Sequence, residues 1–284
     1  MVKGKPVWTP KRRPDSRKGD NGRVLVVGGS RDYVGAPALA ALAALRAGCD
    51  IVKVAAPEKA AWAINALSPD LITIKLDGEY LQKKHVSKIV ESARRADAVL
   101  VGPGLAVKDA KLVNMILAKI SKLSIPLVID ADAVKLAKIS SLRNAIITPH
   151  SKEFELFLAA NHKSLPCDFW ELPDSGKVFW IQKSLSDFLA KGNIVLLKGQ
   201  HDLIVSRERA FISTGGNAGM TVGGTGDILA GLCVGYLAQT KDILESAVMA
   251  SHNCKRIGDE LLKKSNFGFG FISSDFLKLI KRLR

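Results

Sequence analysis

"RVLVVGGSRDYVGAPALAALAALRAGCDIVKVAAP" occupies residues 23–57. An unbroken apolar run leads into a glycine-rich turn, then into an alanine- and leucine-rich segment, and a second apolar run closes the stretch. Pro37 lies near the start of the middle segment and Gly48 just past its end, which is typical of the two ends of a helix. Short, uninterrupted apolar runs are typical of strands in a buried parallel sheet. The stretch therefore predicts a β-α-β unit.

The same alternation continues along the chain. Further strands are expected near residues 71–76, 98–105, 126–132, 145–150 and 194–199, with a hairpin over 202–213. Further helices are expected near residues 58–66, 86–95, 109–120 and 245–264. Three more helices are expected: one that begins at residue 151, one that ends at residue 191 and one that begins at about residue 225. No linker rich in Pro, Gly or Ser divides this series, and no repeat of fixed period appears. We predict an α/β fold with a central, mostly parallel sheet and helices on both faces, formed as one domain over residues 23–284.

The first 22 residues have a different character. Eight Lys or Arg lie between Lys3 and Arg23. Runs of like charge are usually solvated. We expect residues 1–22 to form a basic, irregular arm.

Composition limits the classes of partner. The chain of 284 residues has 42 basic and 27 acidic side chains, a net charge of +15, which suits polyanions such as nucleotides or nucleic acid. Aromatic residues make up only 6% and no RNA-binding aromatic motif occurs, so nucleic acid is not expected. The longest apolar run, residues 228–238, is too short to span a bilayer, so no membrane partner is expected either.

The four cysteines are Cys49, Cys167, Cys233 and Cys254. They lie far apart and form no CxxC pair, which favours reduced, buried thiols over disulfides or a zinc site. Together with an N-terminus that has no apolar leader, this predicts a cytoplasmic protein.

A second glycine-rich stretch, "NAGMTVGGTGDILAGLCVGYLA", covers residues 217–238. Gly223, Gly224 and Gly226 allow backbone amides to converge on one point, and Thr225 lies among them where an apolar helix begins. Amides and the positive end of a helix dipole together bind phosphate. The alternative is an ordinary helix cap, since Thr and Asp are both favoured there. Three glycines cost conformational entropy that a cap does not require, so we favour the phosphate site.

Asp227 follows this turn directly. A carboxylate beside a phosphate site is explained if it accepts the proton of a substrate hydroxyl that attacks a phosphoryl group. We expect the helix dipole to keep Asp227 ionised at neutral pH. Further along, Gly231 and Gly235 share one helix face and are expected to admit a close neighbour, the helix over 245–264.

Six segments carry a resemblance to a known family. In order, "GGSRDYVGAPALAALAALRAG", "VGPGL", "LVIDADAV", "ITPHSKEF", "VLLKG" and "NAGMTVGGTGDILAGL" resemble the ADP-dependent NAD(P)H-hydrate dehydratases, which belong to the ribokinase-like superfold. The resemblance covers roughly residues 20–260. It implies repair of (6S)-NAD(P)H hydrate: ADP phosphorylates the 6-hydroxyl, phosphate is eliminated, and NAD(P)H, AMP and phosphate are released.

The resemblance also implies roles for particular residues. Asp227 would be catalytic and contact the hydrate. The implied hydrate-binding residues are Ala36, Gly104 and His150, and the implied adenine-nucleotide residues are Lys198, Gly199, Gln200, His201, Asp202 and Gly226. Lys198 suits phosphate as a compact positive charge. The bland alternative for His150 is a histidine that only hydrogen-bonds backbone.

Magnesium is expected to bind with the nucleotide phosphates and not at a protein-only site. Glu153 occupies the place of an acid that related vitamin kinases associate with Mg²⁺, although a Glu at a helix start also favours the dipole. Asp130 and Asp132 could shape the cleft or hold a metal-bound water, and two acids near a nucleotide imply a counter-ion. Asn217 is a further candidate site residue.

Three positions depart from the family pattern. Ala106 stands where a further glycine is common, Ser151-Lys152 where Pro-Gly or Ala-Gly is usual, and Ala218 where Pro is frequent. None removes a chemical group, so they concern the shapes of loops.

The family resemblance further implies a homo-oligomer, a tetramer, and a separate epimerase for which 284 residues leave no room. The alternative activity is that of a ribokinase-like kinase of a small vitamin-precursor alcohol, of the hydroxyethylthiazole or hydroxymethylpyrimidine type. Such a kinase would accumulate a stable phosphorylated alcohol.

Overall fold

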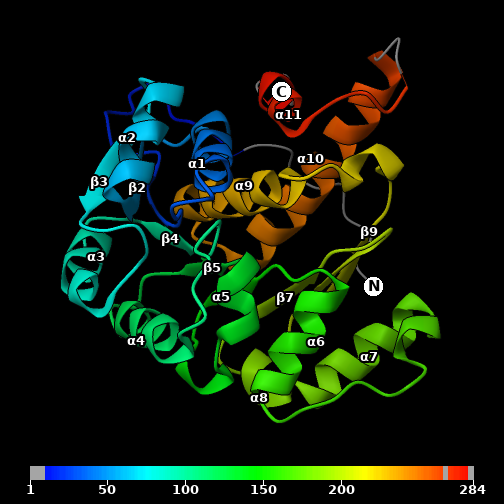
Figure 1. Cartoon of the computed structure of the whole chain (residues 1–284). Coiled ribbons are helices and arrows are strands. Elements are labelled where there is room, and N and C mark those ends of the chain that lie inside the picture. The colour runs from blue at the N-terminus through cyan, green and yellow to red at the C-terminus, as the bar shows by residue number, and fades with distance from the viewer. Residues whose placement is uncertain (1–9, 265–267, 281–284) are drawn as a thin grey trace.

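The computed structural model describes residues 10–264 and 268–280. Within this part of the chain, nine strands form a single sheet (Figure 1). They are β1 (Arg23–Val27), β2 (Ile51–Pro57), β3 (Ile72–Leu76), β4 (Ala98–Val101), β5 (Leu127–Ile129), β6 (Ala145–Ile147), β7 (Ile194–Leu197), β8 (Asp202–Val205) and β9 (Ala210–Ser213).

The sheet is parallel from β3 to β7. Its order is β3-β2-β1-β4-β5-β6-β7-β8-β9, and every neighbouring pair up to β6-β7 is parallel. The pairs β7-β8 and β8-β9 are antiparallel, as the hairpin over residues 202–213 predicted. The predicted mostly parallel α/β sheet is therefore confirmed.

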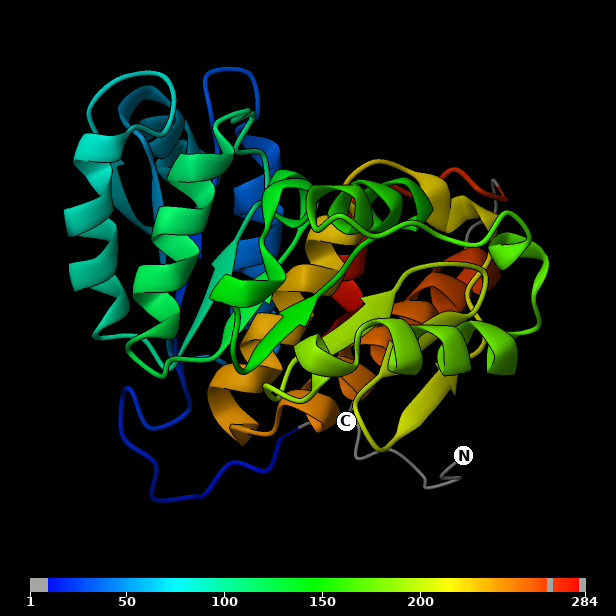
Figure 2. The same ribbon diagram turned by 90° about the horizontal axis from the view of Figure 1, so that it is seen from below.

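Helices cover both faces. They are α1 (Gly35–Arg46), α2 (Glu58–Leu67), α3 (Val86–Ala93), α4 (Ala110–Ser121), α5 (Ala131–Leu136), α6 (Ser151–Ala160), α7 (Asp174–Ser184), α8 (Ser186–Leu189), α9 (Thr225–Thr240), α10 (Ile243–Lys264) and α11 (Ser273–Ile280), with short 3₁₀ turns η1 (Lys83–His85), η2 (Ile139–Ser141), η3 (Phe169–Glu171) and η4 (Ala218–Thr221). In Figure 1, α1, α2, α9, α10 and α11 lie above the sheet and α3 to α8 below it. Seen from below, the yellow-green α7 and α8 lie in front of the strands and the orange α10 behind them (Figure 2).

Two hydrophobic cores fill these layers, one on each face. Alternate residues of β1 divide between them: Val24 and Val26 join the core beneath α1 and α9, while Leu25 and Val27 join the other. Because successive side chains of a strand point to opposite faces, a strand buried on both faces reads as a continuous apolar run.

Helix α9 lies between α1 and α10 and is buried along residues 228–238. Its close neighbour at the glycines is α1, so the predicted partner, the helix over 245–264, was wrong. A Cβ at Gly231 would lie 2.2 Å from the carbonyl oxygen of Ala40, and one at Gly235 would lie 2.9 Å from Ala47 Cβ. These glycines let the backbones of α9 and α1 approach directly.

Part of the predicted arm is described. Residues 1–9 lie outside the described residues, and residues 10–22 contain turns but no helix or strand. The Asp50 carboxylate, at the start of β2, accepts hydrogen bonds from the amides of Gly19 (2.7 Å) and Asn21 (3.1 Å) and pairs with Arg12. These contacts thus attach residues 12–21 to the sheet. The boundary of the domain at residue 23 stays a prediction.

Two smaller features complete the fold. Cys49, Cys233 and Cys254 are free and buried, as expected, but Cys167 is exposed, so the prediction of a buried thiol was wrong there. Among the residues that the structure describes, no helix has the length and apolar character needed to cross a membrane.

Candidate active site

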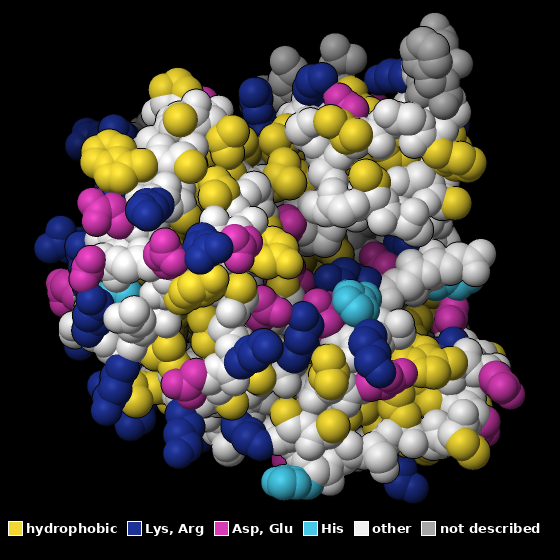
Figure 3. Space-filling view, viewed as in Figure 1, with side chains coloured by type: hydrophobic (Ala, Val, Ile, Leu, Met, Phe, Trp, Pro, Cys, Tyr) yellow, Lys and Arg dark blue, Asp and Glu magenta, His cyan; other side chains and the backbone are white. Residues whose placement is uncertain are grey.

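Polar side chains gather where the parallel strands end. The turns after β5, β6 and β7 approach the first turn of α9, because the carboxyl ends of parallel strands share one edge of the sheet. Figure 3 shows a hollow on this face, between α9 and α6, at which basic, acidic and histidine side chains meet. Segments that are far apart in the sequence therefore meet at one edge of the sheet.

Lys198 follows β7 and occupies the middle of this group. Its Nζ lies 3.1 Å from Asp130 Oδ1 and 3.6 Å from Glu153 Oε2. Asp130, only 3% exposed at its side chain, also accepts a hydrogen bond of 2.7 Å from the Thr148 hydroxyl. The counter-ion that the sequence implied for Asp130 is thus Lys198. Burial lowers the pKa of Lys198, but Asp130, Glu153 and Asp227 outweigh this, so the net pKa is raised and the side chain stays charged.

Glu153 and His150 build the start of α6. Glu153 Oε2 accepts the His150 amide at 3.0 Å, and His150 Nδ1 accepts the Lys152 amide at 3.2 Å, which forms a reciprocal cap. The His150 ring remains half-exposed. The structural alternatives for these two residues, capping and backbone contact, are therefore both present. The exposed part of the His150 ring is what remains for contact with a ligand.

Asp227 does not cap α9. The helix starts after Gly224, whose φ of 97° is left-handed, and no side chain caps it. A Cβ at Gly224 would lie 2.8 Å from both Leu39 Cδ1 and Ser273 Oγ, so only glycine fits. Across the described part of the chain, the amides of Gly226 and Asp227 meet no hydrogen-bond acceptor. Free amides at a helix start are typical donors to an anion, so the first turn of α9 is a candidate anion site.

The other residues of this turn hold its shape. The Thr225 hydroxyl donates to the carbonyls of Met220 (2.8 Å) and Val222 (3.1 Å), and the carbonyl of Gly223 accepts from the Ser273 hydroxyl. A Cβ at Gly226 would lie 3.3 Å from Lys198 Nζ, which places this ammonium group beside the anion site.

The protonation of Asp227 differs from the expectation. Burial and the charge of Asp130 raise its pKa to about 7, with a smaller contribution from Glu153, while Lys198 acts in the opposite direction. The expectation that Asp227 is ionised at neutral pH was therefore wrong in part, because burial and the neighbouring Asp130 carboxylate disfavour its charged form. A carboxylate with a pKa near 7 suits a general base.

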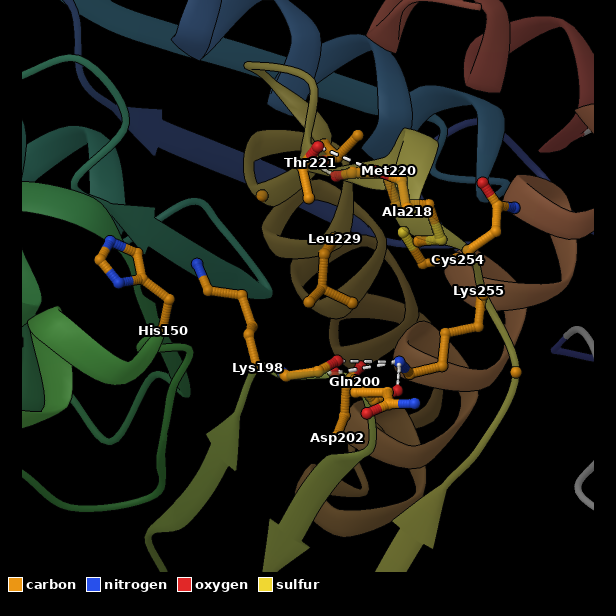
Figure 4. A pocket seen from close by; sticks show the side chains of 16 residues that line it. His150, Lys198, Gln200, Asp202, Ala218, Met220, Thr221, Leu229, Cys254 and Lys255 are labelled. Carbon is orange, nitrogen blue, oxygen red and sulfur yellow. Dashed lines mark hydrogen bonds and ion pairs between the residues drawn. The ribbon is translucent and has the colours of Figure 1, made fainter. Parts of the chain in front are cut away.

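A pocket of about 790 Å³ opens beside Lys198 (Figure 4). Its lining includes five residues of the implied nucleotide set, Lys198, Gly199, Gln200, Asp202 and Gly226, and also His150, Asn217 and Thr225. Asn217 begins η4, where its side chain accepts the Gly219 amide at 3.1 Å and donates to Asp259 at 3.3 Å. The pocket lies between the turn after β7 and the first turn of α9, with the volume of a small-molecule site.

Besides Lys198, two side chains of the implied nucleotide set are already engaged with protein. The buried Asp202 carboxylate accepts the Gly199 amide (3.1 Å) and the Ser251 hydroxyl (2.7 Å). His201 is not part of the pocket lining, and its Nδ1 lies 2.7 Å from Asp174 Oδ2 in α7.

The implied hydrate residues divide in space. His150 lines the pocket with the nucleotide set. Ala36 is the second residue of α1, and Gly104 packs against the same end of that helix, since a Cβ at Gly104 would lie 2.9 Å from Tyr33 Cβ and 3.3 Å from Pro37 Cδ. Leu39 of α1 in turn lies against Gly224, so α1 also approaches the turn at which α9 begins.

Ala106 is one of the positions that depart from the family pattern. Its φ is 50°, a left-handed conformation in which glycine is favoured, and its amide donates to Asp132 Oδ2 at 2.9 Å. Asp132 also pairs with Lys135 at 2.8 Å. Asp132 therefore shapes this loop. No group of three or more His, Cys, Asp or Glu side chains among the described residues is arranged to hold a metal ion.

Sequence reasoning missed Thr148 and Lys255. The Thr148 hydroxyl orients Asp130, and its position before "PH" was the available signal. Lys255 of α10 is 5% exposed and donates to the carbonyls of Gly199 (3.1 Å) and Gln200 (2.8 Å). It lies 55 residues from Gln200 in sequence, and no local pattern marked it.

Comparisons with known proteins agree with this geometry. A family model described as NAD(P)H-hydrate dehydratase matches residues 24–282. The chain is 42% identical over 276 residues to the bifunctional NAD(P)H-hydrate repair enzyme Nnr of Methanothermobacter thermautotrophicus, covering 95% of this chain and 51% of that protein. It is 36% identical to the ADP-dependent (S)-NAD(P)H-hydrate dehydratase of Cenarchaeum symbiosum, covering 86% and 83%. The chain thus spans about half the length of the bifunctional relatives.

Solved structures share the fold. A ribokinase-like superfamily protein from Enterococcus faecalis superposes with a TM-score of 0.80 at 26% identity, covering 96% of this chain and 90% of that one. The Bacillus subtilis ADP/ATP-dependent NAD(P)H-hydrate dehydratase, co-crystallised with ATP/Mg²⁺, superposes with a TM-score of 0.75 at 20% identity, covering 99% and 98%. The predicted ribokinase-like architecture is confirmed.

Proposed function

This chain belongs to the NAD(P)H-hydrate dehydratase family, and from that membership we propose that it converts (6S)-NAD(P)H hydrate back to NAD(P)H at the expense of ADP. The observation that carries the proposal is the placement of Asp227, with a pKa raised to about 7, in the uncapped first turn of α9, close enough to Lys198 for the two charges to interact. A base and an uncapped helix start in one turn, with a cation beside that turn, are the parts that phosphoryl transfer to a hydroxyl needs.

The proposed reaction has two stages. In the first, Asp227 accepts the proton of the 6-hydroxyl as its oxygen bonds to the β-phosphorus of ADP, and the bond from that phosphorus to AMP breaks. In the second, the electron pair of the ring nitrogen expels the phosphate from C6 and C5 loses a proton, which restores the dihydronicotinamide. The sum is hydrate plus ADP giving NAD(P)H, AMP and phosphate.

Each neighbour of Asp227 has a proposed part. The amides of Gly226 and Asp227, with the dipole of α9, would bind the transferred phosphoryl group, and Lys198 would neutralise its charge. Gly223, Gly224 and Thr225 shape this turn. The residues after β7 would receive the nucleotide in the pocket of about 790 Å³, and Ala36 and Gly104, on the α1 side, would receive the hydrate.

Magnesium fits this site as a companion of the nucleotide. The Asp130 and Glu153 carboxylates are both engaged by Lys198, which leaves no set of three free protein ligands among the described residues. Glu153 would approach Mg²⁺ held on the ADP phosphates, where the ion offsets phosphate charge.

The setting of the reaction is also proposed. Three buried free thiols suit the reducing cytoplasm. We expect a homo-oligomer, as the family resemblance implies, and an epimerase activity supplied beside this domain, as the bifunctional relatives combine both in name.

The test is to mix the protein with hydrated NADH, ADP and Mg²⁺ and to follow the dihydronicotinamide absorbance. Return of the absorbance with equal amounts of AMP and phosphate supports the proposal. Accumulation of a stable phosphorylated alcohol from a vitamin precursor, with no return of absorbance, would identify the kinase alternative instead. A requirement for ATP in place of ADP would overturn the proposed phosphoryl donor.

A further inference from the structure

A buried polar cluster lies behind the turn that follows β7. It consists of Asp202 at the start of β8 and Ser251 and Lys255 on α10, with exposed fractions of 6%, 0% and 5%. Lys255 Nζ lies 3.4 Å from Asp202 Oδ1, and the Ser251 hydroxyl donates to the other carboxylate oxygen. Figure 4 shows Lys255 reaching from its helix to the turn.

This cluster binds the backbone on one side of the turn over residues 199–201. Lys255 binds the carbonyls of Gly199 and Gln200, and Asp202 binds the amide of Gly199. Across the described residues, the amides of Gln200 and His201 meet no acceptor. With its carbonyls held by Lys255, the turn retains backbone donors for a ligand in the pocket that Gln200 lines.

A buried ion pair is a weak source of net stability, because desolvation of two charges offsets their attraction. Apolar residues of similar size in place of both Asp202 and Lys255 would fill the same volume without that cost. What an apolar residue cannot do is bind two carbonyl oxygens. The effect that is specific to Lys255 is therefore that it fixes the conformation of the turn.

We propose that Lys255, held by Asp202 and Ser251, is a positioning residue that sets the affinity of the pocket for adenine nucleotide by fixing the turn over residues 199–201. The inference rests on the proposed function in that the nucleotide is ADP. Fixing a binding turn before the ligand arrives raises affinity, since ordering the turn no longer opposes binding.

The test compares ADP binding by calorimetry, with Mg²⁺, in the wild type, Lys255→Gln and Lys255→Met. Gln retains a donor for one carbonyl and Met retains none, so we expect Kd to rise in the order wild type, Gln, Met, by about 10-fold or more for Met. In turnover assays, KM for ADP should rise similarly while kcat at saturating ADP and KM for hydrate change by less than about 3-fold.

The control is Lys241→Met, which removes the Lys241–Asp97 pair (2.7 Å) at the far end of α9. It should leave ADP affinity unchanged. If Lys255→Met does not fold because Asp202 is left uncompensated, the double variant Asp202→Asn/Lys255→Met removes that charge, and its Kd should still rise by about 10-fold.

The outcomes separate the two proposals. Unchanged ADP affinity in folded Lys255→Met or in the double variant overturns the positioning role and leaves the proposed activity standing. Wild-type protein that binds ADP, loses affinity in the variants and yet fails to restore NADH overturns the proposed activity alone. Wild-type protein that binds no adenine nucleotide overturns both.

Discussion

Lys198 Nζ lies 3.1 Å from Asp130 Oδ1, so the ammonium group beside the first turn of α9 is already held by a buried carboxylate. The same carboxylate acts in opposite directions on two neighbours. It helps to keep Lys198 charged and it raises the pKa of Asp227. Asp130 thereby links the cation that would meet phosphate to the proposed base.

Replacing the proposed base tests its role directly. Asp227→Asn keeps the size of the side chain and removes its ability to accept a proton, so we expect kcat to fall by roughly 10²–10⁴-fold with a native circular dichroism spectrum. Asp187→Asn, at an exposed carboxylate in α8, is the matched control and should retain full turnover. Full activity in Asp227→Asn would contradict the mechanism.

The pH dependence of turnover reports the same group. Because the pKa of Asp227 is raised to about 7 by burial and by Asp130, kcat/KM should rise with pH, reach half of its maximum near pH 7 and level off about one unit higher. Asp130→Asn removes the neighbouring charge, so the midpoint should move to lower pH. A midpoint that stays in place in this variant would show that another group controls the profile.

Stability should change with pH in a predictable direction. In the unfolded chain Asp227 titrates near 3.8 and in the folded chain near 7. Between these values the unfolded chain loses the proton while the folded chain retains it, so the free energy of unfolding falls as pH rises towards 7.

Asp227→Asn lacks this titration. From pH 5 to pH 8, we expect the wild type to lose about 1–3 kcal/mol relative to the variant, as measured by urea unfolding of both proteins at each pH. Parallel stability curves for the two proteins would show that the folded pKa of Asp227 is ordinary.

Because α9 and α1 are in close contact, a single methyl group added between them is expected to lower the free energy of unfolding. Gly231→Ala places Cβ 2.2 Å from the Ala40 carbonyl oxygen, so the helices must separate, and we expect a loss of about 1–3 kcal/mol in urea unfolding. Gly35→Ala, where a Cβ would meet no atom within 4 Å, should change stability by less than about 1 kcal/mol. Equal effects at both positions would contradict the close approach.

Ala106 offers a stabilising change. Its left-handed φ of 50° costs an alanine about 1–2 kcal/mol, more than the entropy that glycine loses on folding, so Ala106→Gly should gain about 0.5–1 kcal/mol. Ala110→Gly, at the first residue of α4, should instead lose stability, and thermal unfolding of both variants checks the sign. A loss in Ala106→Gly would show that the loop is not strained.

The sequence predicted those features that a local pattern encodes. Continuous apolar runs located the strands buried on both faces, and the glycine-rich stretch over residues 217–238 located the start of the buried helix α9. It did not predict α5 or α11. Helix α5 has only six residues, and no helical pattern was identified over α11.

Features that depend on distant residues were missed or wrongly assigned. The pKa of Asp227 follows from burial beside Asp130 and Glu153, which the chain brings together only on folding. The partner of Gly231 was wrongly assigned for the same reason: helix spacing identifies the face of α9 but not whether α1 or α10 covers it. Lys255 was missed because its partners are carbonyl oxygens, which no residue type marks.

The glycine contact between α9 and α1 has a mechanical consequence. Helix α9 carries Asp227 at its first turn, and α1 carries Ala36 at its own first turn. With Gly231 against Ala40 and Gly235 against Ala44 and Ala47, the two helices meet backbone to backbone over a full turn and leave no side-chain layer in which to slide. The distance between Asp227 and the first turn of α1 is therefore set by the fold and does not depend on what is bound.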